Sequence, residues 1–296
     1  MSERPVEVWR LPEEERRAGR RAVAWTVGPG GELAVLLVPE EYAAPAGSWA
    51  SVRLPFDGEV LVAPGTAGER RVPLGRVPEP PDHLALLPGG RVLLAGARAE
   101  QQGGEWLPNG SGYGPDGTPG PELALGDDIR VLVTGRDGRI WMAYGDEGIY
   151  GDHPLSCSGL RAVDTRGRSV WSPDRAGLPG HPLEGLAGAT EGPRAWLAWY
   201  PGSSGSYLTR VDPADGTQFT VPCPVRLPVG FAIRGREGVF LSRDGELSRQ
   251  LLVGKTWKRT GRSTPDLPGE PDRERAFGRD GVLWFRRGGS WYRVSV

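Results

Sequence analysis

The segment "IRVLVTGRDGRIWMAYG" (residues 129–145) shows the pattern that decides the fold. Two short apolar runs flank the turn sequence Gly-Arg-Asp-Gly, which is the signal of a β-hairpin. The same sequence of strand, glycine turn and strand recurs along the chain. Further copies are "AVAWTVGPGGELAVLLV" (22–38), "DHLALLPGGRVLLAGARA" (82–99), "GFAIRGREGVFLSRDG" (230–245) and "ERAFGRDGVLWFRRGG" (274–289). The repetition predicts an array of related β units.

The composition agrees with a folded protein that is dense in turns. The 46 glycines and 29 prolines together make about a quarter of the 296 residues, a level that can signal disorder. However, 38% of the residues are hydrophobic and 11 are tryptophan, which a disordered chain would not hold. A β protein with many tight turns explains both observations.

The charge pattern excludes a general nucleic-acid binder. The formal net charge is −1, and basic clusters such as "EEERRAGRR" (13–21) are mixed with acids, as in a solvated segment. Residues 12–20 are the only candidate helix. No apolar run reaches the length of a signal peptide or a membrane span. Two cysteines, Cys157 and Cys223, make no disulfide framework. We expect a soluble cytoplasmic monomer with reduced thiols.

Each hairpin is followed by two weaker strands, so the repeating unit has four strands over about 45 residues, as in a blade of a β-propeller. The predicted blades are 20–78, 80–126, 127–177, 183–224, 228–262 and 272–296. The last segment is one strand short, and residues 5–11 form a lone strand that can complete it. We therefore predict an all-β protein, residues 1–296, folded as a single six-bladed β-propeller whose ring is closed by the N-terminal strand. Seven blades are the alternative.

The segments "GRDGRIWMAYGDEGIYG" and "GRDGVLWFRRGGSWYRV" resemble bacterial propellers of the NHL, SMP-30 and virginiamycin B lyase type. The chain is most similar in character to actinobacterial propellers of unassigned function. The SMP-30 type implies a divalent metal held partly by asparagines, but Asn109 is the only asparagine here. The virginiamycin B lyase type implies a histidine and a glutamate that act on a lactone ester. None of the three histidines lies in the final blades, so no catalytic residue is transferred.

In a propeller, the loops that lead into the innermost strands and the loops between second and third strands meet on one face, where function commonly sits. These loops contain Asp127, Glu184 and Glu274, and all three histidines. An alternative is that each acid only caps neighbouring backbone N–H groups. The candidate rim for a ligand is Asp82, His83, Asp128, Asp146, Glu147, Tyr150, His153, His181 and Asp272.

Aromatic residues give two further expectations. The hairpin residues Trp25, Trp141, Trp196, Trp199 and Trp284 should pack between blades. Exposed loop aromatics could form a platform for a sugar or a partner; the candidates are Trp49, Trp106, Tyr113 and Tyr207.

Two functions of different classes fit these features. The first is a non-catalytic binding or scaffold propeller that uses the loop face and the mouth of the central channel for a protein or small molecule. The second is a lyase or hydrolase of a lactone, ester or sugar with an acid or base in the channel mouth. We expect no cofactor and no nucleic-acid or membrane partner. A divalent cation in the channel stays open, because carboxylates and histidines suit Mg, Mn or Zn.

Overall fold

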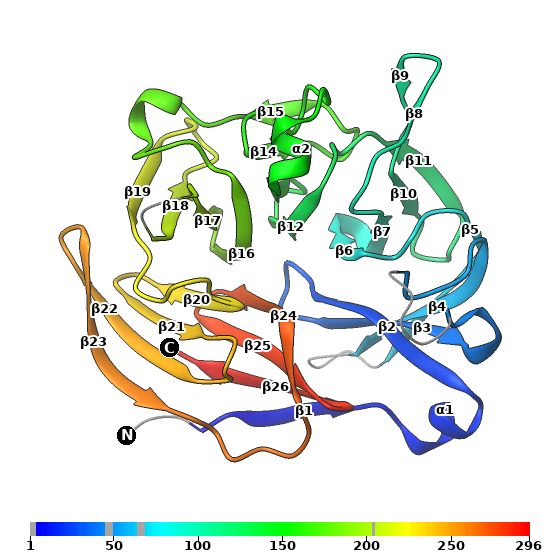
Figure 1. Ribbon diagram of the computed structural model, residues 1–296. Coiled ribbons are helices and arrows are strands. Elements are labelled where there is room, and N and C mark those ends of the chain that lie inside the picture. Colours follow the sequence, from blue (N-terminus) through cyan, green and yellow to red (C-terminus); the bar gives the residue numbers. More distant parts are fainter. Residues whose placement is uncertain (1–3, 45–49, 64–68, 203–204) are drawn as a thin grey trace.

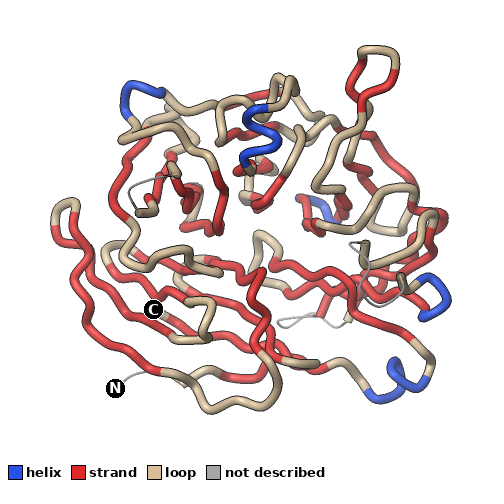
Figure 2. Tube along the Cα trace, viewed as in Figure 1, coloured by secondary structure: helices blue, strands red, loops and turns tan. Residues whose placement is uncertain are grey.

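The computed structural model describes residues 4–44, 50–63, 69–202 and 205–296, and its regular secondary structure is mostly β-strand (Figures 1 and 2). The described residues form two α-helices of one turn each, α1 (Glu13–Arg17) and α2 (Asp146–Tyr150). Single 3₁₀ turns occur at Glu40–Tyr42, Pro88–Gly90 and Arg175–Gly177. The described part of the chain has no helix long and apolar enough to cross a membrane.

Most strands belong to antiparallel units of four, which follow one another along the chain. The first unit comprises β2 (Arg20–Val27), β3 (Leu33–Pro39), β4 (Phe56–Ala63) and β5 (Arg70–Val77). The second comprises β6 (His83–Leu87), β7 (Arg91–Ala95), β10 (Gly110–Tyr113) and β11 (Pro119–Leu123). The third comprises β12 (Ile129–Thr134), β13 (Ile140–Tyr144), β14 (Leu160–Val163) and β15 (Ser169–Trp171).

The remaining units follow the same plan. The fourth comprises β16 (Glu184–Glu191), β17 (Arg194–Tyr200), β18 (Tyr207–Val211) and β19 (Gln218–Pro222). The fifth comprises β20 (Gly230–Arg234), β21 (Glu237–Leu241), β22 (Leu247–Val253) and β23 (Thr256–Ser263). The sixth comprises β24 (Pro271–Arg279), β25 (Val282–Arg287), β26 (Ser290–Ser295) and β1 (Val6–Arg10). A small additional hairpin is formed by β8 (Gln101–Gln102) and β9 (Glu105–Trp106).

The first strands of the units, β2, β6, β12, β16, β20 and β24, surround a common centre, with the later strands outside them (Figure 1). We call the end where the chain enters these inner strands the loop face. We call the opposite end, which carries the turns from inner to second strands, the turn face. These turns lie at 28–32, 88–90, 135–139, 192–193, 235–236 and 280–281.

The inner strands converge at the turn face. There β24 pairs directly in parallel with β16, through Ala189 with Gly278 and Thr190 with Arg279. A Cβ at position 278 would lie 2.0 Å from the carbonyl oxygen of Phe231 and 2.6 Å from Cβ of Ala189. Since real Cβ atoms do not approach backbone so closely, glycine is what lets three inner strands meet here.

A buried arginine joins the inner strands at the same end. The Arg279 guanidinium donates from Nε to the Val27 carbonyl (2.8 Å), and from Nη1 to the Thr134 carbonyl and to Thr190 Oγ1 (3.0 Å). The Thr134 hydroxyl in turn donates to the Leu86 carbonyl (2.9 Å). One side chain of β24 is thus bonded to β2, β12 and β16, and through a threonine to β6.

Arg279 keeps its positive charge although it is buried. Burial lowers the pKa of the guanidinium to about 10, while the negative charges of Glu32 and Asp280 oppose the shift. The side chain therefore remains protonated at neutral pH, and its N–H donors are matched to carbonyl and hydroxyl acceptors of the neighbouring strands.

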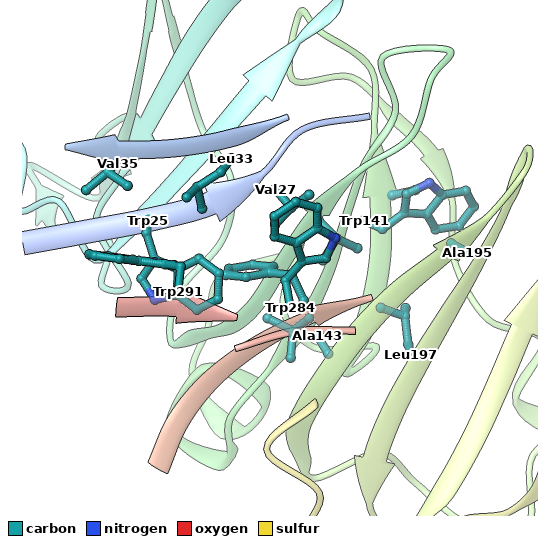
Figure 3. Close-up of a cluster of buried hydrophobic side chains, with 14 of the residues drawn as sticks. Trp25, Val27, Leu33, Val35, Trp141, Ala143, Ala195, Leu197, Trp284 and Trp291 are labelled. Carbon is teal, nitrogen blue, oxygen red and sulfur yellow. The ribbon is translucent and has the colours of Figure 1, made fainter. Parts of the chain in front are cut away.

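The largest hydrophobic cluster contains aromatic side chains from several units (Figure 3). Trp25 on β2 meets Trp291 on β26 with ring centroids 6.3 Å apart, and Trp9 on β1 packs edge-on against Trp291 at 4.8 Å. Trp291 is fully buried. The five hairpin tryptophans predicted to pack between blades are all buried: Trp25, Trp141, Trp196, Trp199 and Trp284.

The N-terminal strand pairs with the partner that the sequence predicts. β1 runs antiparallel to β26, with Val6 opposite Arg293 and Arg10 opposite Ser290. It supplies the fourth strand of a sheet whose other three strands come from the C-terminal segment.

The two Arg-Asp-Gly turns differ, although their sequences match. Asp280 and Gly281 form a two-residue turn with φ of +47° and +80°, because Arg279 pairs with Val282. Gly138 also has a positive φ, +83°, but it is the last residue of a four-residue turn closed by its N–H to the Gly135 carbonyl (3.1 Å). Both turn types, the two-residue turn and the longer turn that ends in a left-handed glycine, fit the twist of the flanking strands. The Arg-Asp-Gly sequence alone does not distinguish between them.

Deleting residues 1–11 should lower the melting temperature on the order of 10 °C, since it exposes Trp291 and leaves β26 as an unpaired edge. Differential scanning fluorimetry checks this, with deletion of residues 1–4, which ends before β1, as the control. Equal melting temperatures for the two deletions would show that β1 contributes little.

Replacing Arg279 by Met should reduce the free energy of unfolding by about 3 kcal/mol or more, because the buried carbonyls of Val27 and Thr134 lose their donor. Arg136→Met is the matched control. Arg136 is exposed on the same face, where it pairs with Asp280 (2.6 Å), and its loss should cost less than about 1 kcal/mol. Denaturant titration measures both; similar values would refute the assigned role of Arg279.

Candidate functional site

The loop face contains a pocket of about 720 Å³ at the centre of the six units. It is lined by loops that lead into the inner strands and by loops that follow the second strands, from the second to the sixth unit. The inner strands converge at the turn face. The pocket therefore lies at the opposite, wider end, where the loops surround it. The pocket lies at the face where the sequence predicts that these loops gather.

Three of the predicted rim residues line the pocket: Asp82, Asp146 and Tyr150. The carboxylate of Asp82 accepts the Ala97 N–H (2.8 Å), so it also holds a neighbouring loop. Asp146 begins the helical turn α2 and Tyr150 ends it, with 73% of the tyrosine exposed. The sequence predicts an irregular loop here; the helical turn raises both side chains to the edge of the pocket.

His83 lies deeper than predicted. It is buried beneath the pocket, and its Nε2–H donates to the Ile129 carbonyl (2.8 Å). A cavity of about 30 Å³ beside it shares Arg130 and Arg275 with the pocket. Burial and the positive charge of Arg275 lower the pKa of His83 to about 3, so the ring is neutral at physiological pH.

Glu147 does not line the pocket but points to Arg98, with which it forms an ion pair. Arg98 also binds the buried carboxylate of Asp127 through Nε (2.8 Å) and Nη2 (3.2 Å), and Asp127 accepts the Ala99 N–H (2.9 Å). The two adjacent acids Asp146 and Glu147 therefore have separate surroundings: one faces the pocket and the other a structural network.

Three further predicted rim residues, His153, His181 and Asp272, lie away from the lining of the pocket. His153 is buried against Trp106 of the small hairpin, with ring centroids 4.8 Å apart, and its Nδ1 accepts the Leu155 N–H (3.2 Å). His181 is half-buried in the loop before β16. Asp272 accepts the Arg275 N–H (3.2 Å) at the start of β24.

One side of the pocket is acidic. Arg130 Nε lies 2.9 Å from an oxygen of Asp128 and 3.4 Å from one of Glu184, so two carboxylates flank one guanidinium. Burial raises the pKa of both carboxyls, and Arg130 opposes the shift in each case. The second oxygen of Asp128 is buried without a hydrogen-bond partner among the described residues, and its backbone has a positive φ of +54°.

The lining that comes from the fifth and sixth units is cationic, with Arg243 from the fifth unit and Arg273 and Arg275 from the sixth. Arg243 and Arg273 are exposed and form no ion pair with the described residues. Sequence reasoning missed Arg130, Arg243 and Arg275. The available signal was an arginine at the beginning of an otherwise apolar inner strand, as in "DDIRVLV" and "RERAFG".

Comparisons with solved structures agree on the architecture. A streptogramin B lyase matches with a TM-score of 0.51 and 12% identity, covering 100% of this chain and 98% of that chain. The virginiamycin B lyase of Staphylococcus aureus matches with a TM-score of 0.51 and 13% identity over 99% of both chains. A chain of the mitotic checkpoint complex matches with a TM-score of 0.53 and 10% identity, covering 100% of this chain and 92% of that one.

The chain is a β-propeller. Identities of this size show the fold alone. No sequence model of a protein family matches the chain, and no curated protein matches it in sequence. The virginiamycin B lyase type, which the hairpin sequences resemble, is thus present among the structural neighbours.

Within the described part of this propeller, no three His, Cys, Asp or Glu side chains are grouped so that they could hold a metal. Asn109 is buried and bonded to backbone, since its Nδ2 donates to the carbonyls of Gly96 and Gly126 and its Oδ1 accepts the Leu125 N–H. The side chain of this asparagine therefore holds the backbone of a loop in the second unit.

Among the described residues, the candidates Trp106, Tyr113 and Tyr207 do not form a common exposed aromatic platform. Tyr113 is buried and Tyr207 is half-buried against Trp199, at 5.1 Å between ring centroids. Trp106 packs on His153, and Trp49 lies outside the described residues. Both cysteines are free thiols.

The Asp127 network gives a prediction with a pH dependence. Burial alone would raise the pKa of Asp127, but the bonds from Arg98 and the Ala99 amide outweigh it and hold the pKa below its ordinary value. A carboxyl with a lowered folded-state pKa contributes stability above its unfolded pKa of about 4, and loses it as the pH falls through the folded value. Asp127→Asn should therefore cost about 1.5–3 kcal/mol at pH 7, and the difference from wild type should vanish at strongly acidic pH.

Denaturant titration from pH 7 downward tests this expectation. Glu147→Gln is the control, because it contacts the same arginine from an exposed position and should cost less than about 1 kcal/mol. A penalty for Asp127→Asn that does not change with pH would contradict the electrostatic explanation.

Proposed function

We propose that this chain is a non-catalytic binding propeller that takes an anionic small molecule in the central pocket of its loop face. The carrying observation is the pair of arginines, Arg243 and Arg273, that line the pocket and have no acidic partner among the described residues. Guanidinium groups bind carboxylates and phosphates through paired hydrogen bonds, which makes exposed arginines in a concave site suited to anions.

The size and asymmetry of the pocket support a small molecule over a flat protein surface. A volume of about 720 Å³ falls within the range of roughly 300–1,000 Å³ that small-molecule sites occupy. From the second, third and fourth units, Asp82, Asp146 and Glu184 offer acceptors for hydroxyl or amine groups. The ligand that fits both sides carries an acidic group at one end and hydrogen-bond donors at the other.

The proposal includes the ring on which the pocket depends. We take the six four-stranded units as six blades, with β1 completing the blade of β24–β26. This assignment is supported by the β1–β26 pairing and by the contact of Trp9 and Trp25 with Trp291, which joins the first and last units. A closed ring leaves no inner edge unpaired and holds the loops of five blades around one centre.

A second function, a lyase or hydrolase, is favoured by one observation. Glu184 lines the pocket, and burial raises the pKa of its carboxyl, as an acid or base working near neutral pH requires. Two of the similar structures are lyases by name. In this second function, Glu184 would exchange a proton with the substrate, while Arg130 holds the Glu184 carboxylate in place.

Isothermal titration calorimetry with citrate, inorganic phosphate and glucose 6-phosphate tests the binding function. The double variant Arg243→Gln/Arg273→Gln should weaken binding of the best anion by at least about tenfold, because it removes charge-assisted hydrogen bonds. Arg166→Gln, on an exposed turn between β14 and β15, is the control and should bind like wild type. The proposal fails if wild type binds none of the three at millimolar concentration or if the double variant binds equally well.

The same samples separate binding from catalysis. Analysis of the bound anion by mass spectrometry after incubation should return it unchanged with wild type. If wild type converts the anion to a product and Glu184→Gln does not, the result would favour the lyase or hydrolase function.

A further inference from the structure

A second pocket lies between the fourth and fifth blades, outside the central one. Its volume is about 430 Å³. One wall is the connection from β19 to β20, at Pro224 and Val225, and the other is formed by strands β22 and β23. The connection continues into Leu227 and Val229 of the central pocket, so one segment contributes to the lining of both pockets.

The floor of this pocket is polar where the interior of a blade interface is ordinarily apolar. Ser248 and Gln250 alternate along β22 toward the fourth blade, and both are more than nine-tenths buried. The next residue on the same face, Leu252, joins the hydrophobic cluster between the two blades. The polar floor therefore interrupts an otherwise apolar interface.

The hydrogen bonds of these side chains are incompletely used. Gln250 Nε2 donates to Ser248 Oγ (2.7 Å), and this is the only hydrogen bond of the Gln250 side chain within the described residues. The Gln250 amide oxygen has no hydrogen-bond partner among the described residues, and it is not completely sealed from solvent. A buried amide with an unused acceptor that lines a cavity is placed to bind a molecule inside it.

The remaining lining defines the chemistry of that molecule. Ser242, Glu246 and Arg259 add a hydroxyl, a carboxylate and a guanidinium at the rim. Glu246 is paired with Arg262, so it keeps acceptor capacity while its charge is balanced. Trp257, packed edge-on against Phe240 at 5.4 Å, adds an apolar wall together with the proline and valine of the connection.

We propose that this interblade pocket binds a neutral mono- or disaccharide. Sugar hydroxyls both donate and accept, which matches a lining of amide, hydroxyl, carboxylate and guanidinium groups. Their C–H faces pack against indole and proline surfaces. A peptide strand cannot add to β22, because this strand is already paired on both sides, with β21 and β23. The site is independent of the anion pocket, since it uses none of its arginines.

Saturation-transfer NMR with maltose, cellobiose, lactose and N,N′-diacetylchitobiose tests the site. At least one of the four should show transfer from wild type at millimolar concentration. Gln250→Leu should weaken that binding about tenfold or more, because it removes the buried amide. Ser248→Ala should weaken it less, because it removes one hydroxyl and keeps the amide.

Two controls connect the result to this pocket. Lys258→Gln changes the residue beside Trp257 on the other face of β23, and Arg273→Gln changes only the central pocket; both should bind the sugar like wild type. Melting temperatures of all variants show whether each is folded. If Gln250→Leu does not fold, Ser248→Ala is the variant that tests the site. Absence of transfer with all four sugars, or wild-type binding by both Gln250→Leu and Ser248→Ala, overturns the proposal.

Discussion

The buried guanidinium of Arg279 is the interaction on which the centre of the molecule depends. It is bonded to strands β2, β12 and β16 at the end where the inner strands converge. A charge in that position is stable only while its acceptors surround it, because an unpaired buried charge costs several kcal/mol. The arginine therefore constrains the spacing of strands that are far apart in the sequence, and Gly278 allows their close approach.

This constraint explains why the two ends of the inner strands differ. At the turn face, the turns are short, and Asp280 joins the sixth unit to the fourth and third units by accepting the Gly192 N–H and pairing with Arg136. At the loop face, longer connections of variable length surround an open pocket. A rigid frame with variable loops at one end is a common arrangement for ligand sites, since loops can change without loss of the core.

The repeat pattern of the sequence was sufficient for the all-β propeller architecture and for the pairing of the N-terminal strand with β26. Short apolar runs with glycine turns depend on local rules that a sequence displays directly. It was less informative about the site. Asp146 and Glu147 are adjacent in sequence, but one lines the pocket and the other pairs with Arg98, because α2 turns their side chains in different directions.

What the sequence by itself determined is therefore local: strands, turns and the repetition of short β-hairpins along the chain. The tertiary structure alone decided which charges meet. Arg130 meets Glu184, and Arg243 faces the same pocket as Arg273, although the two members of each pair are tens of positions apart in the chain. The buried amide of Gln250 likewise belongs to a pocket only when β22 lies beside the connection after β19. The physical reason is that burial and charge pairing depend on distances through space, which sequence spacing does not contain.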